Sequence, residues 1–544
     1  MKNCLMLLFL ALSSHCMGQP NEPGYPLGLL YTLPTEDLPE ITLPYYDNEE
    51  LQNMENCENC GFLFGRDIRQ PYDFMQLAST MVIEENGYAL EVKRLLINSP
   101  SAFALQVYFS HFELDTGVKF YIYSTEHPER VIGAFTQNNN RSDFSFITND
   151  TWGKTMILEL DRRIIGSVNN TASILHISGF VHIFWNRFDF NDAIAFDPCV
   201  DNVLCQPLNN TWCNQLRSVV KLRNRINDTL WSSCSGSIIN TTDDNWSPLL
   251  LTAEHCVDFE DIQLSQAYFN FHSPFCVPTT MGNDMMMLQG MSVVVTDEGS
   301  ELPSCPDVGL LRLNDSIPLQ YNVFFAGWNR EGWNDLPDDH EGTVIHHLQG
   351  DVKKFSVGDI RNSSADLNGC LRVDWTDGLV FFGSSGAPLF VSSGHIIGTV
   401  SHGPTNTTCA NPSSGDHSWL NKSWNVLQPH LAPGNTEVQV HDGRDPVSAC
   451  ISHLHLSRIF YPGNDWQRRN QITIQAANTI ILAESGVETA VSNSPAYMTV
   501  SHNADYIVRA GNHITIHPGF HINTPFRPPG SGVYTTDFRW GSGK

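Results

Sequence analysis

Three short segments, met in a fixed order along the chain, constrain this sequence more than any other feature. They are Leu251-Thr252-Ala253-Glu254-His255-Cys256, then Pro306-Asp307, then Gly383-Ser384-Ser385-Gly386-Ala387-Pro388. A serine hydroxyl is a weak nucleophile at neutral pH, so it needs an imidazole to take its proton and a carboxylate to fix the imidazole tautomer. The order histidine, aspartate, serine is one of the known triad orders. The sequence therefore predicts a serine nucleophile with a histidine base.

The histidine and the aspartate each border an apolar segment. His255 follows the apolar run 249–251 and precedes Cys256, whose expected disulfide partner is Cys234 on an adjacent strand. Asp307 precedes the apolar segment 308–313, where a carboxylate must be hydrogen-bonded or paired to offset its desolvation. We expect the Nδ1–H group of the histidine to be that partner. Asp315 and Asp297 are the alternative acids.

The turn around Ser385 has the features that a nucleophilic serine requires. Gly383 and Gly386 permit a tight turn that exposes the hydroxyl. The backbone amides of Gly383 and Ser385 would then face a developing oxyanion. Ser384 is the other possible nucleophile, but the serine directly before glycine fits the form G-x-S-G-x-P. We therefore predict Ser385 as the nucleophile.

Length and composition describe a globular chain that we expect to be secreted. A chain of 544 residues exceeds one ordinary core, and its 41% hydrophobic residues, with 10% aromatic residues, argue against disorder. The basic start, the apolar run 4–12 and the small residues up to 18 are typical of a secretory signal peptide. That run is too short to span a bilayer, so we expect no membrane span.

Cysteines and glycosylation sequons fit an oxidising, extracellular setting. Two of the 14 cysteines lie in the expected signal, which leaves an even number to pair. Cys57 and Cys60 indicate a local disulfide rather than half of a metal site, because no second such pair is visible. Sequons that would carry glycans in a glycosylating host include those at Asn149, Asn227, Asn240, Asn314 and Asn406.

Charge and histidine spacing limit the classes of partner. The net charge of −27 opposes binding to nucleic acid or anionic membranes, which requires basic patches. Adjacent His346 and His347 would point to opposite faces of a strand, and His453 and His455 lack a third ligand, so neither pair predicts a metal site. We expect a monomer that acts on proteins or peptides and requires no cofactor.

Strand-like segments separated by turns predict a mostly β chain in six parts. These parts are a signal peptide (1–18), an extended lead-in (19–60), an N-terminal β-sandwich (61–187), the domain that carries the triad (199–428), a linker (429–446) and a small C-terminal all-β module (447–544). In the sandwich, Phe103, Leu105, Val107 and Phe109 would share one face. In the last part, segments 476–482 and 510–516 echo each other, which suggests a repeated strand or two chance hairpins.

Together these segments resemble the lysyl endopeptidase family of secreted, chymotrypsin-fold serine peptidases, in particular its multidomain bacterial members. The similarity covers nearly the whole of 199–428. The matching segments are 199–205, 217–220, 234–236, 251–256, 307–317, 321–323, 327–330, 345–347, 350–354, 383–390 and 398–409. The resemblance implies a central double β-barrel, an N-terminal prodomain and hence a zymogen, and a C-terminal β module.

The resemblance also implies a set of disulfides and a substrate pocket. The disulfides would be Cys199–Cys409, Cys205–Cys276 and Cys234–Cys256, while Cys213, Cys305, Cys370 and Cys450 stay unassigned. The pocket would receive lysine, with Asp416 as its acid and His402 in its lining. A carboxylate is required there because an unpaired buried ammonium is costly. Two segments beside the pocket, 380–382 and 417–420, differ from the family pattern.

Three functional hypotheses follow from these residues. The first is a secreted serine endopeptidase that forms an acyl-enzyme and prefers lysine before the cleaved bond. The second is an inactive homologue that binds partners outside the cell, and the third is a carbohydrate-binding or adhesion protein with a vestigial peptidase domain. Because no triad residue is missing, the first hypothesis is favoured.

Overall fold

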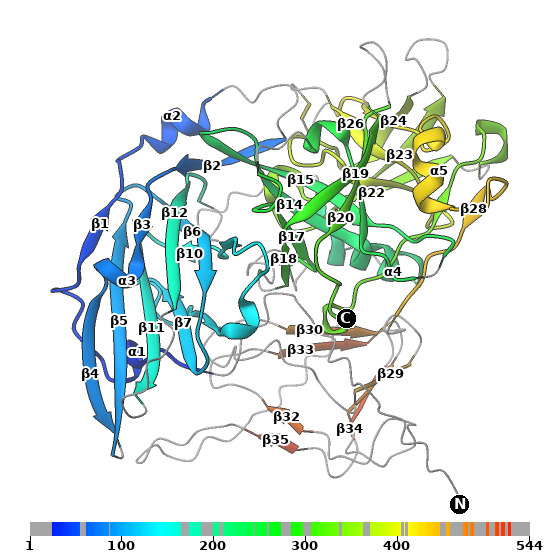
Figure 1. The fold of residues 1–544 in the computed structure, drawn as a ribbon. Helices are drawn as coiled ribbons and strands as arrows, with labels where there is room; N and C mark the ends of the chain where they lie inside the picture. Colours follow the sequence, from blue (N-terminus) through cyan, green and yellow to red (C-terminus); the bar gives the residue numbers. More distant parts are fainter. Residues whose placement is uncertain are drawn as a thin grey trace, which may run out of the picture.

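The computed structural model describes most of the chain up to residue 446 and seven strands beyond it. The described residues are 24–54, 61–85, 87–164, 173–186, 200–205, 210–243, 245–257, 261–273, 284, 286–297, 306–336, 340–362, 370–403, 407–408, 412–446 and seven strands within 453–523. They form mainly strands with a few short helices, which confirms the predicted β class (Figure 1). The expected signal peptide and the Cys57/Cys60 pair lie outside these residues.

The N-terminal domain contains two sheets that face each other. Its strands are β1 (Glu40–Thr42), β2 (Phe62–Ile68), β3 (Tyr72–Asp73), β4 (Ser79–Glu85), β5 (Tyr88–Asn98), β6 (Ala104–Glu113), β7 (Val118–Tyr123), β8 (Ile132–Phe135), β9 (Phe146–Ile147), β10 (Thr151–Trp152), β11 (Thr155–Ile164) and β12 (Ile174–Ile183). One sheet has the order β1-β5-β11-β7-β8 and the other begins β10-β6-β12-β2. Leu105, Val107 and Phe109 of β6 lie together in the core, as their alternation predicts. Leu158 of β11 and Phe120 of β7 meet them from the facing sheet.

The segment expected to be an extended lead-in is packed onto this domain. Helices α1 (Leu27–Leu30) and α2 (Asn48–Gln52) flank β1, which pairs in parallel with β5. The Gly28 amide donates a hydrogen bond to a Glu159 carboxylate oxygen at 2.7 Å in the domain interior. Residues 24–54 therefore belong to the N-terminal domain, together with the short helix α3 (Phe74–Leu77).

The first barrel of the central domain follows helix α4 (Asn210–Ser218). Its strands are β14 (Val219–Arg225), β15 (Leu230–Ile238), β16 (Leu249–Thr252), β17 (Gln266–Phe269), β18 (Met287–Gln289), β19 (Met291–Asp297) and β20 (Val308–Leu313). They pair in the order β18-β17-β14-β15-β16-β20-β19. Only Gly290 separates β18 from β19, so the chain itself joins the two ends of this strand order, and the φ of +81° at that position favours glycine.

The second barrel is a closed ring of six strands. These are β22 (Glu341–His346), β23 (Lys354–Asn362), β24 (Leu371–Asp377), β25 (Pro388–Val391), β26 (Ile396–His402) and β27 (Gly415–His417). The order β25-β22-β23-β24-β27-β26 returns to β25 through an additional β25–β26 pairing. The short strand β13 (Asp201–Asn202) pairs with β23 outside this ring. Two barrels in sequence confirm the chymotrypsin-like double barrel.

The segment expected to be a linker is also packed rather than extended. Helix α5 (Trp424–Leu431) continues through Pro429, and Leu427 and Leu431 are buried in the core between the barrels. Strand β28 (Val440–His441) pairs with β21 (Trp328–Asn329). Residues 429–446 therefore belong to the central domain.

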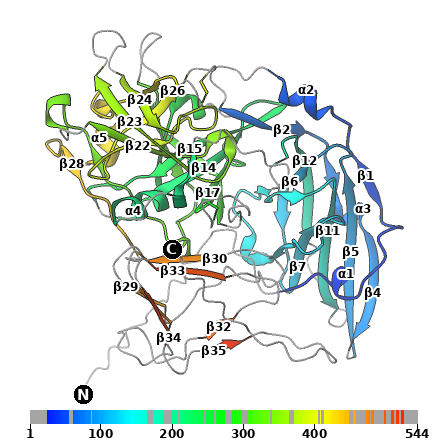
Figure 2. The same cartoon turned by 180° about the vertical axis from the view of Figure 1, so that it is seen from behind.

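One sheet runs through both the N-terminal and the central domain. Strand β2 pairs with β12 on one side and with β15 of the first barrel on the other, so that Phe62 lies opposite Ser233. Figures 1 and 2 show this junction between the blue and green parts of the ribbon. The boundary expected between 187 and 199 is thus bridged by backbone hydrogen bonds.

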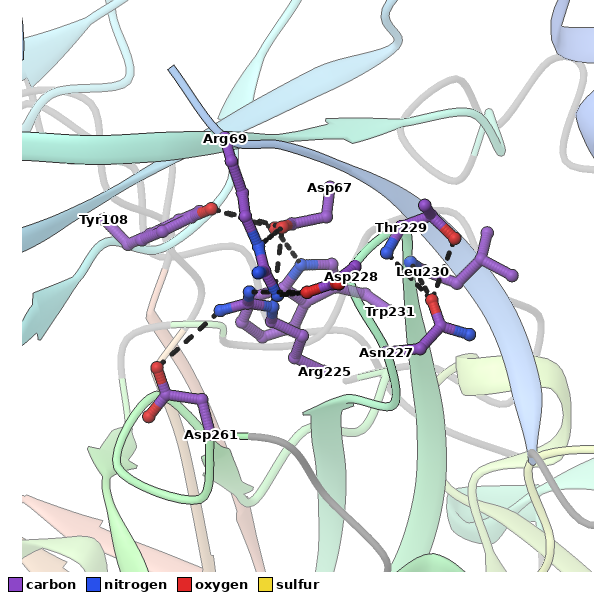
Figure 3. A network of polar contacts seen from close by, with 10 residues as sticks. All are labelled: Asp67, Arg69, Tyr108, Arg225, Asn227, Asp228, Thr229, Leu230, Trp231 and Asp261. Carbon is purple, nitrogen blue, oxygen red and sulfur yellow. Dashed lines mark hydrogen bonds and ion pairs between the residues drawn. The ribbon is translucent and has the colours of Figure 1, made fainter. Parts of the chain in front are cut away.

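Polar side chains also join the two domains at this junction (Figure 3). Asp67 of β2 accepts hydrogen bonds from Trp231 Nε1 at 2.8 Å and from the Tyr108 hydroxyl at 3.1 Å. Arg225 Nε lies 3.4 Å from the same carboxylate. Burial raises the pKa of Asp67, and the hydrogen bonds from Trp231, Tyr108 and Arg69 oppose that rise. The sheet and this network together hold the N-terminal domain on the first barrel.

The described C-terminal strands pair in parallel. They are β29 (His453–Leu456), β30 (Ile472–Ala476), β31 (Thr479–Leu482), β32 (Tyr497–Thr499), β33 (Tyr506–Ala510), β34 (His513–Ile516) and β35 (His521–Asn523). The two segments that echo each other lie side by side, with Ala476 opposite Ala510 and Thr479 opposite His513. Parallel pairing excludes a hairpin between these strands, and it is the pairing expected of a repeat that stacks on itself.

Candidate active site

The His255 and Asp307 side chains meet between the ends of two adjacent strands. His255 follows β16 in a short 3₁₀ turn, and Asp307 directly precedes β20, the neighbour of β16. His255 Nδ1 lies 2.8 Å from Asp307 Oδ2, and the His255 backbone amide donates to Asp307 Oδ1 at 3.1 Å. Each side chain is only 8% exposed. The carboxylate thus holds both the backbone and the ring of the histidine.

Burial and charge act in opposite directions on this pair. Burial alone would raise the pKa of Asp307, but the attraction and hydrogen bonds of His255 lower it to about 2. Burial alone would lower the pKa of His255, but Asp307 raises it. Asp307 is therefore ionised at neutral pH, and it orients a histidine whose Nε2 atom stays available. Of the alternative acids, Asp315 binds Arg141 at 2.8 Å instead.

The turn that carries Ser385 packs directly against the histidine segment. A Cβ atom added to Gly386 would collide with the Thr252 hydroxyl and lie 2.7 Å from the Ala253 nitrogen. The Ser385 carbonyl accepts a hydrogen bond from the Ser235 amide at 2.8 Å. Between the described side chains of Ser385 and His255 there is no hydrogen bond, and such bonds often tighten only when substrate binds.

The orientation of the Gly383 and Ser385 amides follows from the hydrogen bonds of the carbonyl groups in the same peptide units. The Phe382 carbonyl accepts from the Gln349 amide at 2.6 Å, and the Ser384 carbonyl accepts from the Ala387 amide at 2.9 Å. In a trans peptide the C=O and N–H bonds point in opposite directions, so the amides of Gly383 and Ser385 face the other way. Gly383 has a φ of +87°, and an added Cβ would lie 2.7 Å from the Gln349 nitrogen. Glycine is therefore required at this position.

The second serine of the turn is directed inward. Ser384 is fully buried, and its hydroxyl lies 2.7 Å from His346 Nδ1 and 3.2 Å from the Phe381 amide. Burial lowers the pKa of His346 to about 3, so its ring is neutral. Ser384 therefore supports the turn from below.

Two serines that sequence reasoning did not single out hold the site together. Ser401 at the end of β26 donates its hydroxyl proton to Asp307 Oδ2 at 2.5 Å. Ser235 of β15 donates its hydroxyl proton to the Gly383 carbonyl at 2.8 Å. Both residues lie in segments that carried the family resemblance, beside His402 and Cys234. The sequence does not reveal their role, because Ser401 and Asp307, and likewise Ser235 and Gly383, are far apart in sequence and meet only in the folded barrels.

The two residues expected in the substrate pocket lie on neighbouring strands. His402 of β26 is opposite Asp416 of β27, and the His402 ring centre lies 6.0 Å from that of His255. Because Ser401 gives its proton to Asp307, His402 Nδ1 donates to the Ser401 hydroxyl at 2.6 Å. Asp416 accepts two hydrogen bonds from Arg372, at 2.8 and 3.1 Å. The carboxylate expected to receive lysine therefore already binds a guanidinium.

One of the expected disulfides is described in full. Cys234 and Cys256 are bonded, with Cα atoms 6.3 Å apart, which confirms that pairing. The bond ties β15 to the turn that presents His255. Cys205, Cys213 and Cys370 are also disulfide-bonded. Cys199, Cys276, Cys305, Cys409 and Cys450 lie outside the described residues, so the other two expected pairings stay predictions.

Neither a metal site nor a membrane helix is found in the described part of the chain. No group of three or more histidine, cysteine, aspartate or glutamate side chains there could hold a metal ion. His346 and His347, the adjacent histidines for which the sequence predicts no metal site, are fully buried. No described helix is long and apolar enough to cross a membrane.

Two barrels, with an Asp–His pair and a glycine-bounded serine turn packed between them, define a trypsin-like serine peptidase domain. Residues 195–420 match the family model described as "Lysyl endopeptidase, C-terminal domain". The central domain is therefore similar to the lysyl endopeptidase family over these residues.

Single relatives and solved structures were also compared with the chain. A lysyl endopeptidase of Pseudomonas aeruginosa is 26% identical over 167 residues, which cover 30% of this chain and 34% of that protein. A thermostable serine protease, AL20, from an extremophilic microorganism aligns with a TM-score of 0.31 and 14% identity over 41% of this chain and 100% of its own. The HtrA-type protease AlgW aligns with a TM-score of 0.29 and 16% identity over 42% and 64%. Similarities this low between structures carry no argument about function.

Proposed function

We propose that the protein is a secreted serine endopeptidase whose catalytic residues are His255, Asp307 and Ser385. The observation that carries this proposal is the buried hydrogen bond between His255 Nδ1 and Asp307, 2.8 Å long, beside the Ser385 turn. It leaves the second ring nitrogen free to accept a proton. The match of residues 195–420 to a peptidase family model supports the same assignment.

The proposed reaction has two halves. Ser385 Oγ attacks the peptide carbonyl while His255 Nε2 takes the hydroxyl proton, and the amides of Gly383 and Ser385 stabilise the oxyanion. The C–N bond breaks as His255 returns the proton to the leaving amine, which leaves an acyl-enzyme. A water molecule then attacks the acyl carbonyl with the same base, and Ser385 leaves with its proton. Throughout, Asp307 holds the ring and stabilises the imidazolium.

Labelling with a fluorophosphonate probe tests this proposal. Because the probe reacts with an activated serine, we expect the wild-type protein and Ser384→Thr to be labelled, and Ser385→Ala not to be labelled. Ser384→Thr keeps the buried hydroxyl that contacts His346. A folded wild-type protein that is not labelled would favour the inactive homologue instead.

The finer substrate prediction rests on the resemblance alone. It places lysine before the cleaved bond, with Asp416 and His402 in the pocket. The binding of Asp416 to Arg372 means that a substrate lysine would compete with a bidentate guanidinium. The lysine preference therefore stays a prediction.

We further propose that residues 61–187 belong to a prosegment of a secreted zymogen. The expected cut lies between 187 and 199, and mass analysis of the exported protein should find a mature chain that begins there. The cut domain should stay attached after cleavage, because β2 shares a sheet with β15. A fully active secreted chain that still begins near Gln19 would contradict the prosegment. Export and glycosylation at the sequons stay predictions.

A further inference from the structure

The amide of Gly383 is held in place by a turn that Gln349 and Gly350 form between β22 and β23. The Gln349 amide donates to the Phe382 carbonyl at 2.6 Å, and that carbonyl belongs to the same peptide unit as the Gly383 amide. If Gln349 moved, this peptide unit could rotate, and its N–H group would no longer face an oxyanion. The proposed catalysis therefore depends on the position of the Gln349–Gly350 turn.

The Gln349–Gly350 turn has a backbone conformation that its own sequence does not favour. Gln349 has a φ of +48° and Gly350 has a φ of +71°, and the left-handed region is uncommon for a residue other than glycine. Such conformations persist only where the surrounding structure enforces them. Contacts with neighbouring segments must therefore hold this turn.

The N-terminal domain provides one of these contacts. A Cβ atom added to Gly350 would lie 3.6 Å from Cδ1 of Phe62, the first residue of β2. Residues of both parts line one small cavity: Phe62, Ile183, Trp185, Gln349 and Gly350. Phe62 is 2% exposed, and its ring centre lies 5.3 Å from that of Trp185. Phe62 is thus packed within its own domain and borders the turn.

The same domain also contacts the residue whose carbonyl the turn binds. Phe382 packs against a buried cluster that includes Phe62 and Ile183 of the N-terminal domain. Its neighbour Phe381 packs against the core of the second barrel instead. Segment 380–382 differs from the lysyl endopeptidase pattern, so this contact is a feature of this chain. Phe382 therefore joins the segment before Gly383 to the N-terminal domain.

We propose that the N-terminal domain is a working part of the peptidase, in which Phe62 and Phe382 position the Gly383 amide of the oxyanion hole through the Gln349–Gly350 turn. This inference rests on the proposed peptidase function. The domain acts in this way in an intact chain and in a chain cut between 187 and 199, because β2 shares a sheet with β15. Both phenylalanines act through the turn and are positioning residues.

The kinetics of Phe62→Ala, measured in the full chain, test this proposal. We expect kcat to fall about 10-fold while KM stays within about threefold, because a misplaced oxyanion donor weakens binding of the transition state and not of the substrate. A peptide aldehyde, whose hemiacetal oxygen would occupy the oxyanion hole, should bind about 10-fold more weakly. Phe382→Ala should lower kcat and aldehyde affinity likewise. Because Phe382 is only partly buried, this variant decides if Phe62→Ala does not fold.

Phe120→Ala is the matched control. Phe120 is fully buried in the core between the two sheets of the N-terminal domain, a cluster separate from that of Phe62. We expect it to lose as much stability in urea unfolding as Phe62→Ala, because each change leaves a cavity. Its kcat and aldehyde affinity should stay within about twofold of the wild-type values.

The outcomes separate this inference from the proposed function. Wild-type kcat and aldehyde affinity in the folded Phe62→Ala and Phe382→Ala variants would overturn the inference and leave the peptidase assignment intact. An equal loss of kcat in Phe120→Ala would also overturn it, because the loss would then follow stability alone. A wild-type protein that neither cleaves peptides nor reacts with the fluorophosphonate probe would overturn the peptidase function, and with it the inference.

Discussion

Replacing Asp307 with asparagine is expected to lower kcat/KM by about 10⁴-fold without unfolding the protein. The carboxylate now accepts from His255 Nδ1 at 2.8 Å and from the His255 amide at 3.1 Å. An asparagine amide group would donate to Nδ1 instead, so the ring proton would move to Nε2. The histidine could then not take the Ser385 proton. Cleavage of a fluorogenic peptide, with circular dichroism as the folding control, measures this loss.

The pH profile distinguishes this orienting role from a structural one. A base must be neutral to accept a proton, so activity should rise with pH through the pKa of His255. Asp307 raises that pKa above its usual 6.5, so the rising part of the wild-type pH–activity curve should have its midpoint above pH 6.5. In Asp307→Asn this midpoint should move to lower pH, because the negative charge that stabilises the protonated His255 ring is gone. An unchanged midpoint would contradict the assignment of Asp307 as the residue that orients His255.

Asp297→Asn is the matched control for this variant. Asp297 is another acid that the sequence alone leaves open, and it ends β19 beside the strand that follows Asp307. It makes no described hydrogen bond to His255. We therefore expect its kcat/KM to stay within about threefold of the wild-type value, as for surface substitutions away from a site.

The sequence predicted the parts of the site whose local setting is distinctive. His255, Asp307 and Ser385 each stand at a strand end or in a glycine turn, and the structure brings their segments together. The contacts of Ser401 and Ser235 could not be predicted, because each reaches the site across strand pairings formed by residues distant in sequence. Asp416 shows the limit of a resemblance, because its two hydrogen bonds with Arg372 arise from a strand pairing that the sequence does not reveal.

Segment boundaries were predicted less well than segment types. Residues 24–54 and 429–446 are rich in proline and polar residues, and this composition indicated an extended lead-in and a linker. Both segments instead gain their order from tertiary contacts, through β1 on β5 and through β28 on β21. The sheet shared by β2 and β15 could not be foreseen either, because the two strands are far apart in sequence and pair across a domain boundary.

Replacing Asp150 with alanine is expected to lower the free energy of unfolding by about 3–5 kcal/mol. Asp150, just before β10, binds Arg223 of β14 through two hydrogen bonds of 2.6 and 2.9 Å, and the side chains are 3% and 9% exposed. The variant would leave a buried guanidinium without its counter-charge. Urea unfolding of the full chain measures the change.

Asp228→Ala provides the matched control at the same junction. Asp228 lies near Arg69 and Arg225 (Figure 3), but its side chain is 67% exposed. Because water screens this ion pair, its loss should cost less than about 1 kcal/mol. The double variant Asp150→Leu/Arg223→Leu should recover much of the lost stability, since no buried charge remains unpaired. Equal costs for Asp150→Ala and Asp228→Ala would mean that the buried pair does not hold the N-terminal domain on the barrel, and the shared sheet alone would have to do so.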